Sequence, residues 1–200
     1  MVTELLLASN NDHKRLEIER LFPGVTVRSP REVDAKLEFE ENGATFFENA
    51  HGKAAALFRA AGMPVIADDS GLCVSALGGA PGIYSNRYGA PKGEPPLQTP
   101  ERNAYLLRRM EGITDRAAHF VCCLVLVLGE DRFFAAQETV EGVIAQSPRG
   151  RNGFGYDPLF LFPARGRTLA ELADAEKDAV SHRGRAARRM LALLSAAEEG

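Results

Sequence analysis

The chain has 200 residues, of which 45% are hydrophobic, and its 27 acidic and 24 basic side chains give a formal net charge of −3. A chain of this length buries about 70% of its unfolded surface and needs neither disulfides nor a structural metal to fold. The acidic balance argues against a protein that coats nucleic acid, which requires a basic face. The longest apolar run, Phe120 to Leu128, is about half as long as a membrane span.

The N-terminus and the cysteines predict a cytoplasmic protein. Glu4 stands where a secretory signal would have a basic flank followed by a long apolar stretch. The chain contains 3 cysteines, an odd number, and Cys122 and Cys123 are neighbours in a predicted strand, where their side chains would point to opposite faces. We expect reduced core thiols, which fit a reducing compartment.

The first segments predict a strand, a polar turn and a helix. A short apolar run, Thr3 to Ala8, is typical of a buried strand. Apolar residues at helical spacing predict a helix over Asp12 to Phe22, which Pro23-Gly24 ends.

The next segments repeat a helix and a strand. Thr45 and Glu48 form a capping box, which predicts a helix over Thr45 to Ala61. Val65 to Ala67 predicts a strand that ends in the turn Asp68-Asp69-Ser70-Gly71, and Leu72 to Val74 is again strand-like. The turn would therefore present two acids at the carboxyl end of a strand.

A proline-rich connection opens the second half of the chain. Ala90 to Pro100 matches no pattern of function, and Thr99-Pro100 begins a helix that runs to Met110. His119 to Leu128 and Phe133 to Ala145 are long strand candidates that predict a hairpin.

The last segments are a loop, a strand and two helices. Gln146 to Pro158 is a glycine-rich polar loop, and Leu159 to Phe162 predicts a short strand. Thr168 with Glu171 caps a short helix, and Ser181 begins the final helix. Mixed strands and helices with one hairpin indicate an α/β fold with a mixed sheet.

Two polar segments in the first half of the chain could carry chemistry. The segment Ser9-Asn10-Asn11-Asp12-His13-Lys14 lies between a strand and a helix, where free N–H groups and the helix dipole favour an anion. Taken alone, the segment is more typical of an ordinary polar cap with a solvated lysine. Glu40-Glu41 and Asp68-Asp69 offer the carboxylate oxygens that Mg²⁺ needs on a phosphate substrate. Adjacent residues in an extended chain point opposite ways, so one acid of each pair would face the site.

Further candidates occur on the second helix and near the C-terminus. Lys53 is either a phosphate contact or a solvent-facing lysine. The segment Phe154-Gly155-Tyr156-Asp157-Pro158 suits stacking on a base, unless its aromatic rings pack into the core. Lys177 and Ser181-His182-Arg183-Gly184 add cationic donors for phosphate or for a purine O6 acceptor.

These segments, in this order, resemble the inosine/xanthosine triphosphate pyrophosphatase family. The similar segments cover nearly the whole chain and are Leu7 to Lys14, Glu41 to Ala50, Ala67 to Tyr88, Gly153 to Phe160, and Glu176 to Arg183. Any one of them could arise by chance, but five in order at the family's spacing could hardly do so. Asn10 and Asn152 depart from the family pattern, which often has glycine at both places.

The resemblance implies an elongated mixed β-sheet flanked by helices, with two lobes around a central cleft, as a single domain over residues 1–200. It implies hydrolysis of non-standard purine nucleoside triphosphates (ITP, dITP and XTP) at the α-phosphorus to a nucleoside monophosphate and pyrophosphate. The family resemblance also implies that Mg²⁺ is required and that the protein is a homodimer, with no nucleic acid or membrane as partner.

The resemblance also implies roles for individual residues. Asp69 is expected to be the general base and a metal ligand, with Asp68 next in line, and Glu41 the second metal ligand, with Glu40 as the alternative. The expected substrate-binding residues are Ser9, Asn10, Asn11, Asp12, His13, Lys14, Lys53, Ser70, Phe154, Gly155, Tyr156, Asp157, Lys177, His182 and Arg183. Two other hypotheses are a nucleotide-binding module without turnover and a pyrophosphatase for other nucleotides. Clustered acids disfavour the first, since a binder gains nothing from negative charge near a triphosphate.

Overall fold

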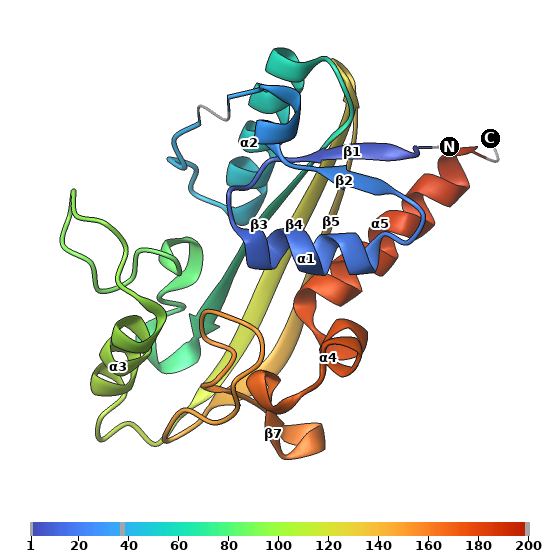
Figure 1. The fold of residues 1–200 in the computed structure, drawn as a ribbon. Helices are drawn as coiled ribbons and strands as arrows, with labels where there is room; N and C mark the ends of the chain where they lie inside the picture. The colour runs from blue at the N-terminus through green and yellow to red at the C-terminus, as the bar shows by residue number, and fades with distance from the viewer. Residues whose placement is uncertain (1, 37–38, 199–200) are drawn as a thin grey trace. The chain divides into compact units, whose positions relative to one another are not determined.

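The computed structural model describes residues 2–36 and 39–198 and shows an α/β protein with a mixed sheet (Figure 1). The strands of this described part are β1 (Glu4–Leu7), β2 (Thr26–Arg28), β3 (Val65–Val74), β4 (Ala117–Gly129), β5 (Arg132–Ile144), β6 (Phe160–Phe162) and β7 (Arg167–Thr168). Their order is β2-β1-β3-β4-β5-β6-β7. β1 pairs in parallel with β2 and β3, whereas β6 pairs antiparallel with β5 and β7. The predicted fold class is confirmed.

The helices confirm most of the sequence expectations. They are α1 (Asp12–Leu21), α2 (Phe46–Ala61), α3 (Thr99–Arg109), α4 (Asp174–Val180) and α5 (His182–Glu198). The side chain of Thr45 caps α2 by accepting a hydrogen bond from Glu48 N, and Gly62 ends α2 in the left-handed conformation. Among the described helices, none combines the length and apolar character that a membrane span needs.

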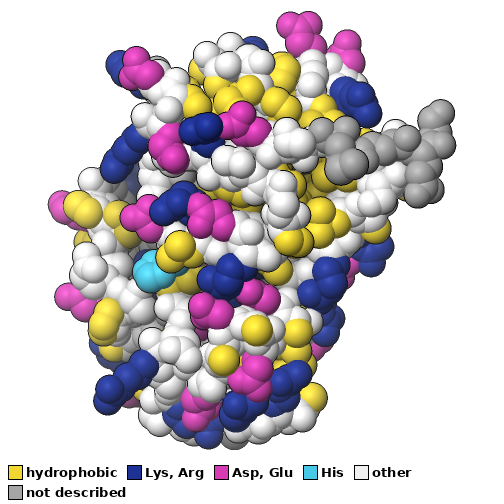
Figure 2. All heavy atoms as spheres, turned by 45° about the vertical axis from the view of Figure 1, so that its right-hand side comes forward, with side chains coloured by type: hydrophobic (Ala, Val, Ile, Leu, Met, Phe, Trp, Pro, Cys, Tyr) yellow, Lys and Arg dark blue, Asp and Glu magenta, His cyan; other side chains and the backbone are white. Residues whose placement is uncertain are grey.

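Side chains of both charges are mixed on the surface. On the face that Figure 2 shows, Lys and Arg side chains are interspersed with Asp and Glu. This mixture agrees with the nearly equal numbers of acidic and basic side chains in the sequence, 27 and 24.

The chain divides into two compact units. The second unit comprises Ser70–Val121 and Thr139–Ser181, and the first unit comprises the rest of the described chain. β3, β4 and β5 each continue from one unit into the other along the chain. The candidate site residues are therefore described unit by unit.

The core of the first unit has two layers, because successive strand residues point to opposite faces. One layer packs strand residues such as Leu7, Ile66 and Cys122 with α1 and α5. The other packs their neighbours, such as Ala67 and Cys123, with α2. Figure 1 shows α2 on one side of these strands and α1 with α5 on the other. Cys122 and Cys123 thus point to opposite faces as predicted, and all the cysteines are free thiols.

The second unit has a core of its own. It packs Leu72 and Val74 of β3 with Leu106 and Met110 of α3. Tyr156 and neighbouring apolar residues of the glycine-rich loop complete it. This loop is therefore anchored to a core and not suspended in solvent.

The predicted turn at Asp68-Asp69-Ser70-Gly71 is wrong, because β3 runs without interruption from Val65 to Val74. β3 lies between β1 and β4, and pairing on both sides outweighs the turn preference of Asp and Gly. The last paired residue of β1, Leu7, lies opposite Ile66. The two acids therefore lie just beyond the carboxyl end of β1.

The sequence analysis also missed three short elements. β2 has three residues and β7 has two, too few for an alternating pattern. α4 has seven residues with hardly any apolar stripe. The short helix expected after Thr168 is a single 3-10 turn, Leu169–Glu171.

Candidate active site

The predicted site residues fall into two groups, one in each unit. The first unit contains the segment Ser9–Lys14, Glu41, Lys53, Asp68, Asp69, His182 and Arg183. The second unit contains Ser70, Phe154, Gly155, Tyr156, Asp157 and Lys177.

The turn before α1 is capped by its own side chain. Asn11 Oδ1 accepts hydrogen bonds from His13 N at 3.0 Å and from Lys14 N at 3.2 Å. Ser9 Oγ accepts from Asn11 N at 3.1 Å. Two of the N–H groups expected to receive an anion therefore already have a protein partner. The ammonium group of Lys14 is the full positive charge that this segment contributes to the site.

Lys14 and Lys53 meet at the backbone of Asp68. Lys14 Nζ lies 2.5 Å from Asp68 Oδ1 and donates to the Asp68 carbonyl oxygen at 3.3 Å. Lys53 Nζ donates to the same carbonyl oxygen at 3.0 Å. The two ammonium groups thus lie close together, each paired with a carboxylate, and ammonium groups are suited to contact phosphate oxygens.

The side chains of Asp68 and Asp69 point to opposite faces of β3. Asp68 follows the pattern of Ile66 toward α1 and α5, where its Oδ2 accepts from Arg183 Nε at 2.8 Å and from Cys122 Sγ at 3.2 Å. Asp69 points toward α2, where its carboxylate lies 3.3 Å from Lys53 Nζ and accepts from Asn49 Nδ2 at 3.4 Å. The period of the strand thus gives adjacent acids different partners.

The two acids have opposite pKa shifts. Burial by itself would raise the pKa of Asp68, but the positive charges of Arg183 and Lys14 outweigh it and hold that pKa well below the usual value. Burial raises the pKa of Asp69, although Lys53 and Lys14 oppose the shift. Asp68 is therefore fixed as a carboxylate, and Asp69 is the acid suited to accept a proton.

A buried chain of ion pairs continues from Asp68 into α1. Arg183 is 1% exposed, and its Nη1 lies 2.5 Å from Glu17 Oε2. Sequence reasoning missed Glu17. Its position three residues after Lys14 was the available signal, since residues three apart lie on one face of a helix. It likewise missed Asn49, which precedes Lys53 by four residues on the buried face of α2.

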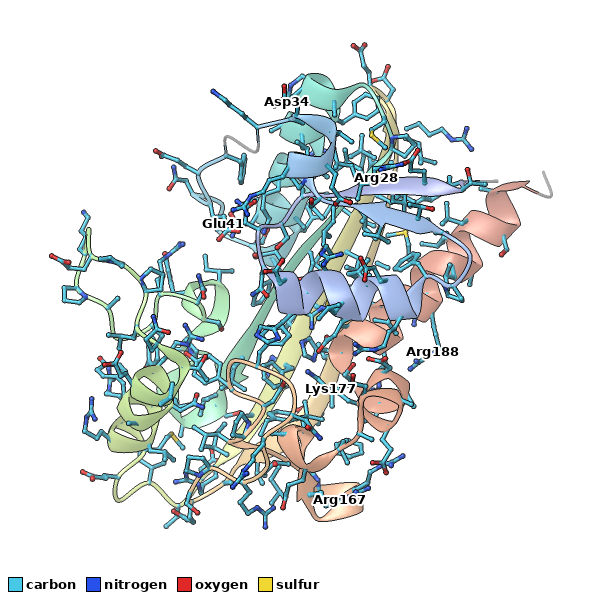
Figure 3. The ribbon with its side chains drawn as sticks, in the orientation of Figure 1. Arg28, Asp34, Glu41, Arg167, Lys177 and Arg188 are labelled. Carbon is cyan, nitrogen blue, oxygen red and sulfur yellow. The ribbon has the colours of Figure 1, made fainter. Side chains whose placement is uncertain are left out.

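Glu40 and Glu41, the two alternatives for the second metal ligand, have different surroundings. Glu41 Oε1 lies 2.6 Å from Lys53 Nζ, the same ammonium group that contacts Asp69. Glu40 is exposed and accepts a hydrogen bond from Asn42. Figure 3 labels Glu41 on the segment that leads into α2. Glu41 and Asp69 thus present carboxylate oxygens to one common cation position.

A cluster around the glycine-rich loop forms the second group. Asp157 Oδ2 lies 2.6 Å from Lys177 Nζ and accepts from Phe154 N at 2.8 Å. Lys177 Nζ also lies 5.0 Å from the centroid of the Phe154 ring. Figure 3 shows Lys177 on α4. Lys177, expected among the cations around the triphosphate, thus contacts Asp157 and the Phe154 ring of the loop cluster.

Gly153 is required by the close approach of this ion pair. It has a φ of +70°, and a Cβ there would lie 2.1 Å from Asp157 Oδ2. Any other residue would displace the Asp157 carboxylate.

Of the remaining predicted residues, Asn10, Asp12 and His13 are exposed, and the others are buried or half-buried. Tyr156 is 4% exposed, and its hydroxyl group donates to the Ser85 carbonyl oxygen at 2.9 Å. Its ring packs in the core of the second unit, whereas Phe154 is half-buried. His182 is buried at the start of α5, and Ser70 is half-buried in β3.

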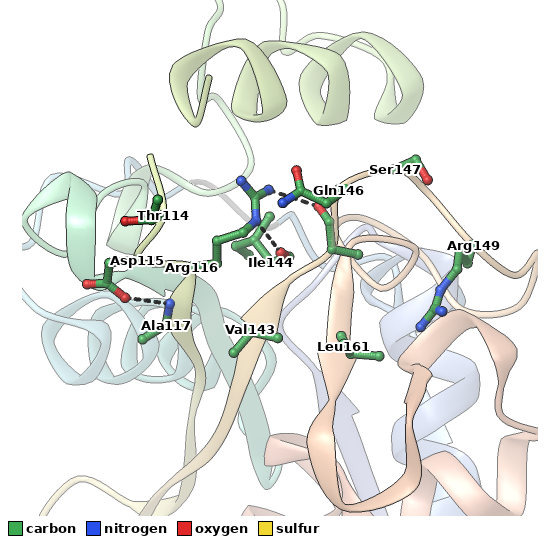
Figure 4. Close-up of a pocket in the computed structure, with 11 residues that line it drawn as sticks. Thr114, Asp115, Arg116, Ala117, Val143, Ile144, Gln146, Ser147, Arg149 and Leu161 are labelled. Carbon is green, nitrogen blue, oxygen red and sulfur yellow. Dashed lines mark hydrogen bonds between the residues drawn. The ribbon is translucent and has the colours of Figure 1, made fainter. Parts of the chain in front are cut away.

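A pocket of about 600 Å³ lies elsewhere in the second unit (Figure 4). Residues at the start of β4 and the end of β5 line it, among them Arg116 and Ile144. The Arg116 guanidinium donates to the carbonyl oxygens of Ile144 and Ala145. None of the predicted site residues lines this pocket.

The fold and the two groups together define a class of protein. An α/β sheet in which lysines and carboxylates meet beyond the end of a parallel strand is suited to binding a phosphorylated ligand. A loop with a half-buried aromatic ring beside a cation is suited to stacking on a base.

The particular family follows from comparison with known proteins. The sequence model of the Ham1 family matches residues 5–193, and the chain belongs to this family. It is 47% identical to the dITP/XTP pyrophosphatase of Treponema denticola over 92% of this chain and 94% of that protein. It is 46% identical to the dITP/XTP pyrophosphatase of Thermus thermophilus over 98% of this chain and 93% of that protein. The structure of a HAM1 protein from Coxiella burnetii matches with a TM-score of 0.85 and 39% identity over 98% of this chain and 99% of that one.

Proposed function

We propose that this protein hydrolyses the non-standard purine nucleoside triphosphates dITP, ITP and XTP to a nucleoside monophosphate and pyrophosphate. The observation that carries the proposal is the pair of adjacent acids, Asp68 and Asp69, whose carboxylates lie 2.5 Å and 3.3 Å from the ammonium groups of Lys14 and Lys53. The names of the relatives support the choice of substrate.

In this proposal Asp69 is the general base. Its carboxylate would take a proton from a water molecule that attacks the α-phosphorus. The amide of Asn49 and the ammonium group of Lys53 orient its two carboxylate oxygens. Asp68, held ionised by Arg183 and Lys14, keeps the Lys14 ammonium group in place for the phosphates.

We further propose that Glu41 and Asp69 hold Mg²⁺ together with the substrate. Both carboxylates contact the Lys53 ammonium group, which keeps them near one another. Across the described residues, no group of three or more His, Cys, Asp or Glu side chains is arranged to hold a metal. Two carboxylates fit Mg²⁺, which usually takes one or two from the protein and completes its shell with water and substrate phosphates. When bound, Mg²⁺ neutralises phosphate charge and polarises a phosphoryl oxygen.

The loop of the second unit is proposed to bind the base. Phe154 supplies a ring for stacking, and Gly153 and Gly155 let the backbone approach the base edge. A donor-only group rewards the 6-keto acceptor of inosine and penalises adenine, whose 6-amino group is itself a donor. His182 and Arg183 were expected in this role. The Arg183 guanidinium contacts Asp68 and Glu17, and its base-reading role stays a prediction.

Product analysis with a panel of triphosphates tests the function. Each nucleotide is incubated with the protein, with Mg²⁺ present or omitted, and the products are separated. We expect pyrophosphate and monophosphate from dITP, ITP and XTP, and far less turnover of ATP and GTP. Orthophosphate as the first product would overturn attack at the α-phosphorus, and strong turnover of pyrimidine nucleotides would favour a pyrophosphatase of other specificity. Binding without turnover would favour a nucleotide-binding module.

The resemblance of the motifs also supports a cytoplasmic homodimer as the working form. Sedimentation velocity over a range of protein concentrations tests the oligomeric state. A monomer at micromolar concentration would overturn it.

A further inference from the structure

The loop that carries Phe154 is held by a part of the second unit to which no function has been assigned. Asn103 of α3 donates a hydrogen bond from Nδ2 to the Gly155 carbonyl oxygen at 3.1 Å. The Tyr156 hydroxyl group donates to the Ser85 carbonyl oxygen at 2.9 Å. Both contacts fall on the two residues directly after Phe154.

Ser85 connects this part to the sheet. Its hydroxyl oxygen accepts a hydrogen bond from Leu72 N at 2.8 Å and donates to the Gly82 carbonyl oxygen at 2.6 Å. Leu72 belongs to β3, the strand that also carries the two acids. The motif Gly78-Gly79-Ala80-Pro81-Gly82-Ile83-Tyr84-Ser85, part of the segment Ala67 to Tyr88 that resembles the family, thus links β3 to the glycine-rich loop.

Arg102 connects the proline-rich segment to the glycine-rich loop through Tyr156. Its Nη1 donates to the carbonyl oxygens of Asn86 at 2.7 Å and Leu97 at 3.3 Å, so it fastens both ends of the excursion. Its guanidinium lies 5.5 Å from the centroid of the Tyr156 ring. Arg102 is 8% exposed, and this burial makes the contacts strong.

Asn103 has a buried polar atom that lowers the stability of the fold. The residue is 3% exposed, and its Oδ1 has no hydrogen-bond partner among the described residues. A buried acceptor without a partner is destabilising, so an apolar residue would serve the core better. Local violations of this kind are expected where a side chain serves function, here through its Nδ2 contact with the loop.

We propose that Asn103, Ser85 and Arg102 are positioning residues that fix the loop Gly153–Asp157 and thereby the Phe154 ring for the purine base. The proposal rests on the proposed function, since it assigns the supporting contacts of the same base site. A binding group works only when the contacts behind it hold its geometry. Losing them should weaken the binding of every purine and leave phosphate binding intact.

The test compares Asn103→Ala with the wild type and with Arg109→Ala, an exposed substitution on the same helix. For each protein, kcat and KM for dITP and XTP are measured with Mg²⁺, and the Kd values of dIMP and inorganic triphosphate are measured by calorimetry. We expect Asn103→Ala to raise both KM values and the dIMP Kd about fivefold, the size expected of one neutral hydrogen bond. The Kd of inorganic triphosphate and kcat should stay unchanged, and Arg109→Ala should match the wild type in every measurement.

Tyr156→Phe is the second variant, because it keeps the ring in the core and deletes only the contact with Ser85. It should shift the same quantities in the same direction, and it decides the matter if Asn103→Ala does not fold. Wild-type values for dIMP in both variants would overturn the proposal, as would a triphosphate Kd that rises in step with the dIMP Kd. A wild-type protein that binds dIMP but does not hydrolyse dITP would instead overturn the proposed function and leave the positioning role to be judged on the dIMP Kd.

Discussion

The two units hold their buried polar groups in different ways. In the first unit, charges of alternating sign follow one another from Glu17 through Arg183 and Asp68 to Lys14. These residues lie on helices and on a central strand. In the second unit, one buried ion pair, Asp157 with Lys177, and several neutral hydrogen bonds hold a loop.

This difference predicts different responses to mutation. Removing one member of a buried charge chain leaves an uncompensated charge on the next, so damage in the first unit is large. Removing one of the neutral hydrogen bonds of the loop cluster leaves only neutral groups, so this damage is smaller and shows mainly in ligand binding. The four substitutions below test this contrast.

The largest effect is expected for Arg183→Ala. It leaves Asp68 and Glu17 as buried carboxylates with one cation fewer, which should lower the free energy of unfolding by about 3–5 kcal/mol. Arg189→Ala, on the exposed side of the same helix, should lower it by less than about 1 kcal/mol. Urea denaturation measures the free energy of unfolding of both variants. Equal losses would show that the buried ion pairs of Arg183 stabilise the protein no more than an exposed ion pair does. If the variant folds, equal losses of kcat/KM on ITP and ATP would end the base-reading hypothesis for Arg183.

Asp69→Asn should abolish most of the turnover without loosening the fold. We expect kcat for dITP to fall by at least ~10²-fold, the low end of what a positioned general base contributes, with little change in KM. Asp34→Asn is a matched control in the first unit, because Asp34 is exposed and has a φ of 52°, which Asn tolerates. Near-normal turnover by Asp69→Asn at saturating Mg²⁺ would move the role to Asp68.

Glu17→Gln compares the stability contribution of the buried ion pair between Glu17 and Arg183 with that of a partly exposed ion pair on α1. Loss of the ion pair with Arg183 should lower the free energy of unfolding by about 1.5–3 kcal/mol. Glu19→Gln, which breaks the partly exposed pair with Arg15 on the same helix, should lower it by no more than about 0.5 kcal/mol. Thermal unfolding of both variants measures the contrast. A Glu17 variant as stable as the Glu19 variant would contradict it.

Phe154→Ala should have the smallest effect and act on binding alone. Loss of stacking should raise KM for ITP, XTP and ATP alike by about tenfold, within the range of base–aromatic stacking. Phe133→Ala, which removes an exposed ring from the first unit, should leave KM unchanged. Steady-state kinetics on the three nucleotides provide the check. A loss confined to one purine would mean that Phe154 reads the base and does not merely stack on it.

Sequence patterns predicted the parts of the fold that rest on local signals. The capping box at Thr45, the apolar stripe of α2 and the two long strands around the hairpin were all found where expected. β3 was missed as a continuous strand because its central residues have turn propensity and its neighbours in the sheet are distant in sequence. Asp69 could be singled out from its motif, but its partner Asn49 could not.

The sequence by itself determined the fold class, the family resemblance and the set of chemically able residues, because these depend on periodicity, motif and residue type. Only the tertiary structure decided which charges meet. In the structure Asp68 forms an ion pair with Arg183, and Asp69 forms one with Lys53. Glu41, and not Glu40, lies beside Lys53. The reason is physical: strand alternation sets the face on which each acid lies, but the helix that supplies its partner comes from a remote part of the chain. The pKa of each acid follows from that partner and from burial, and neither is a local property of the sequence.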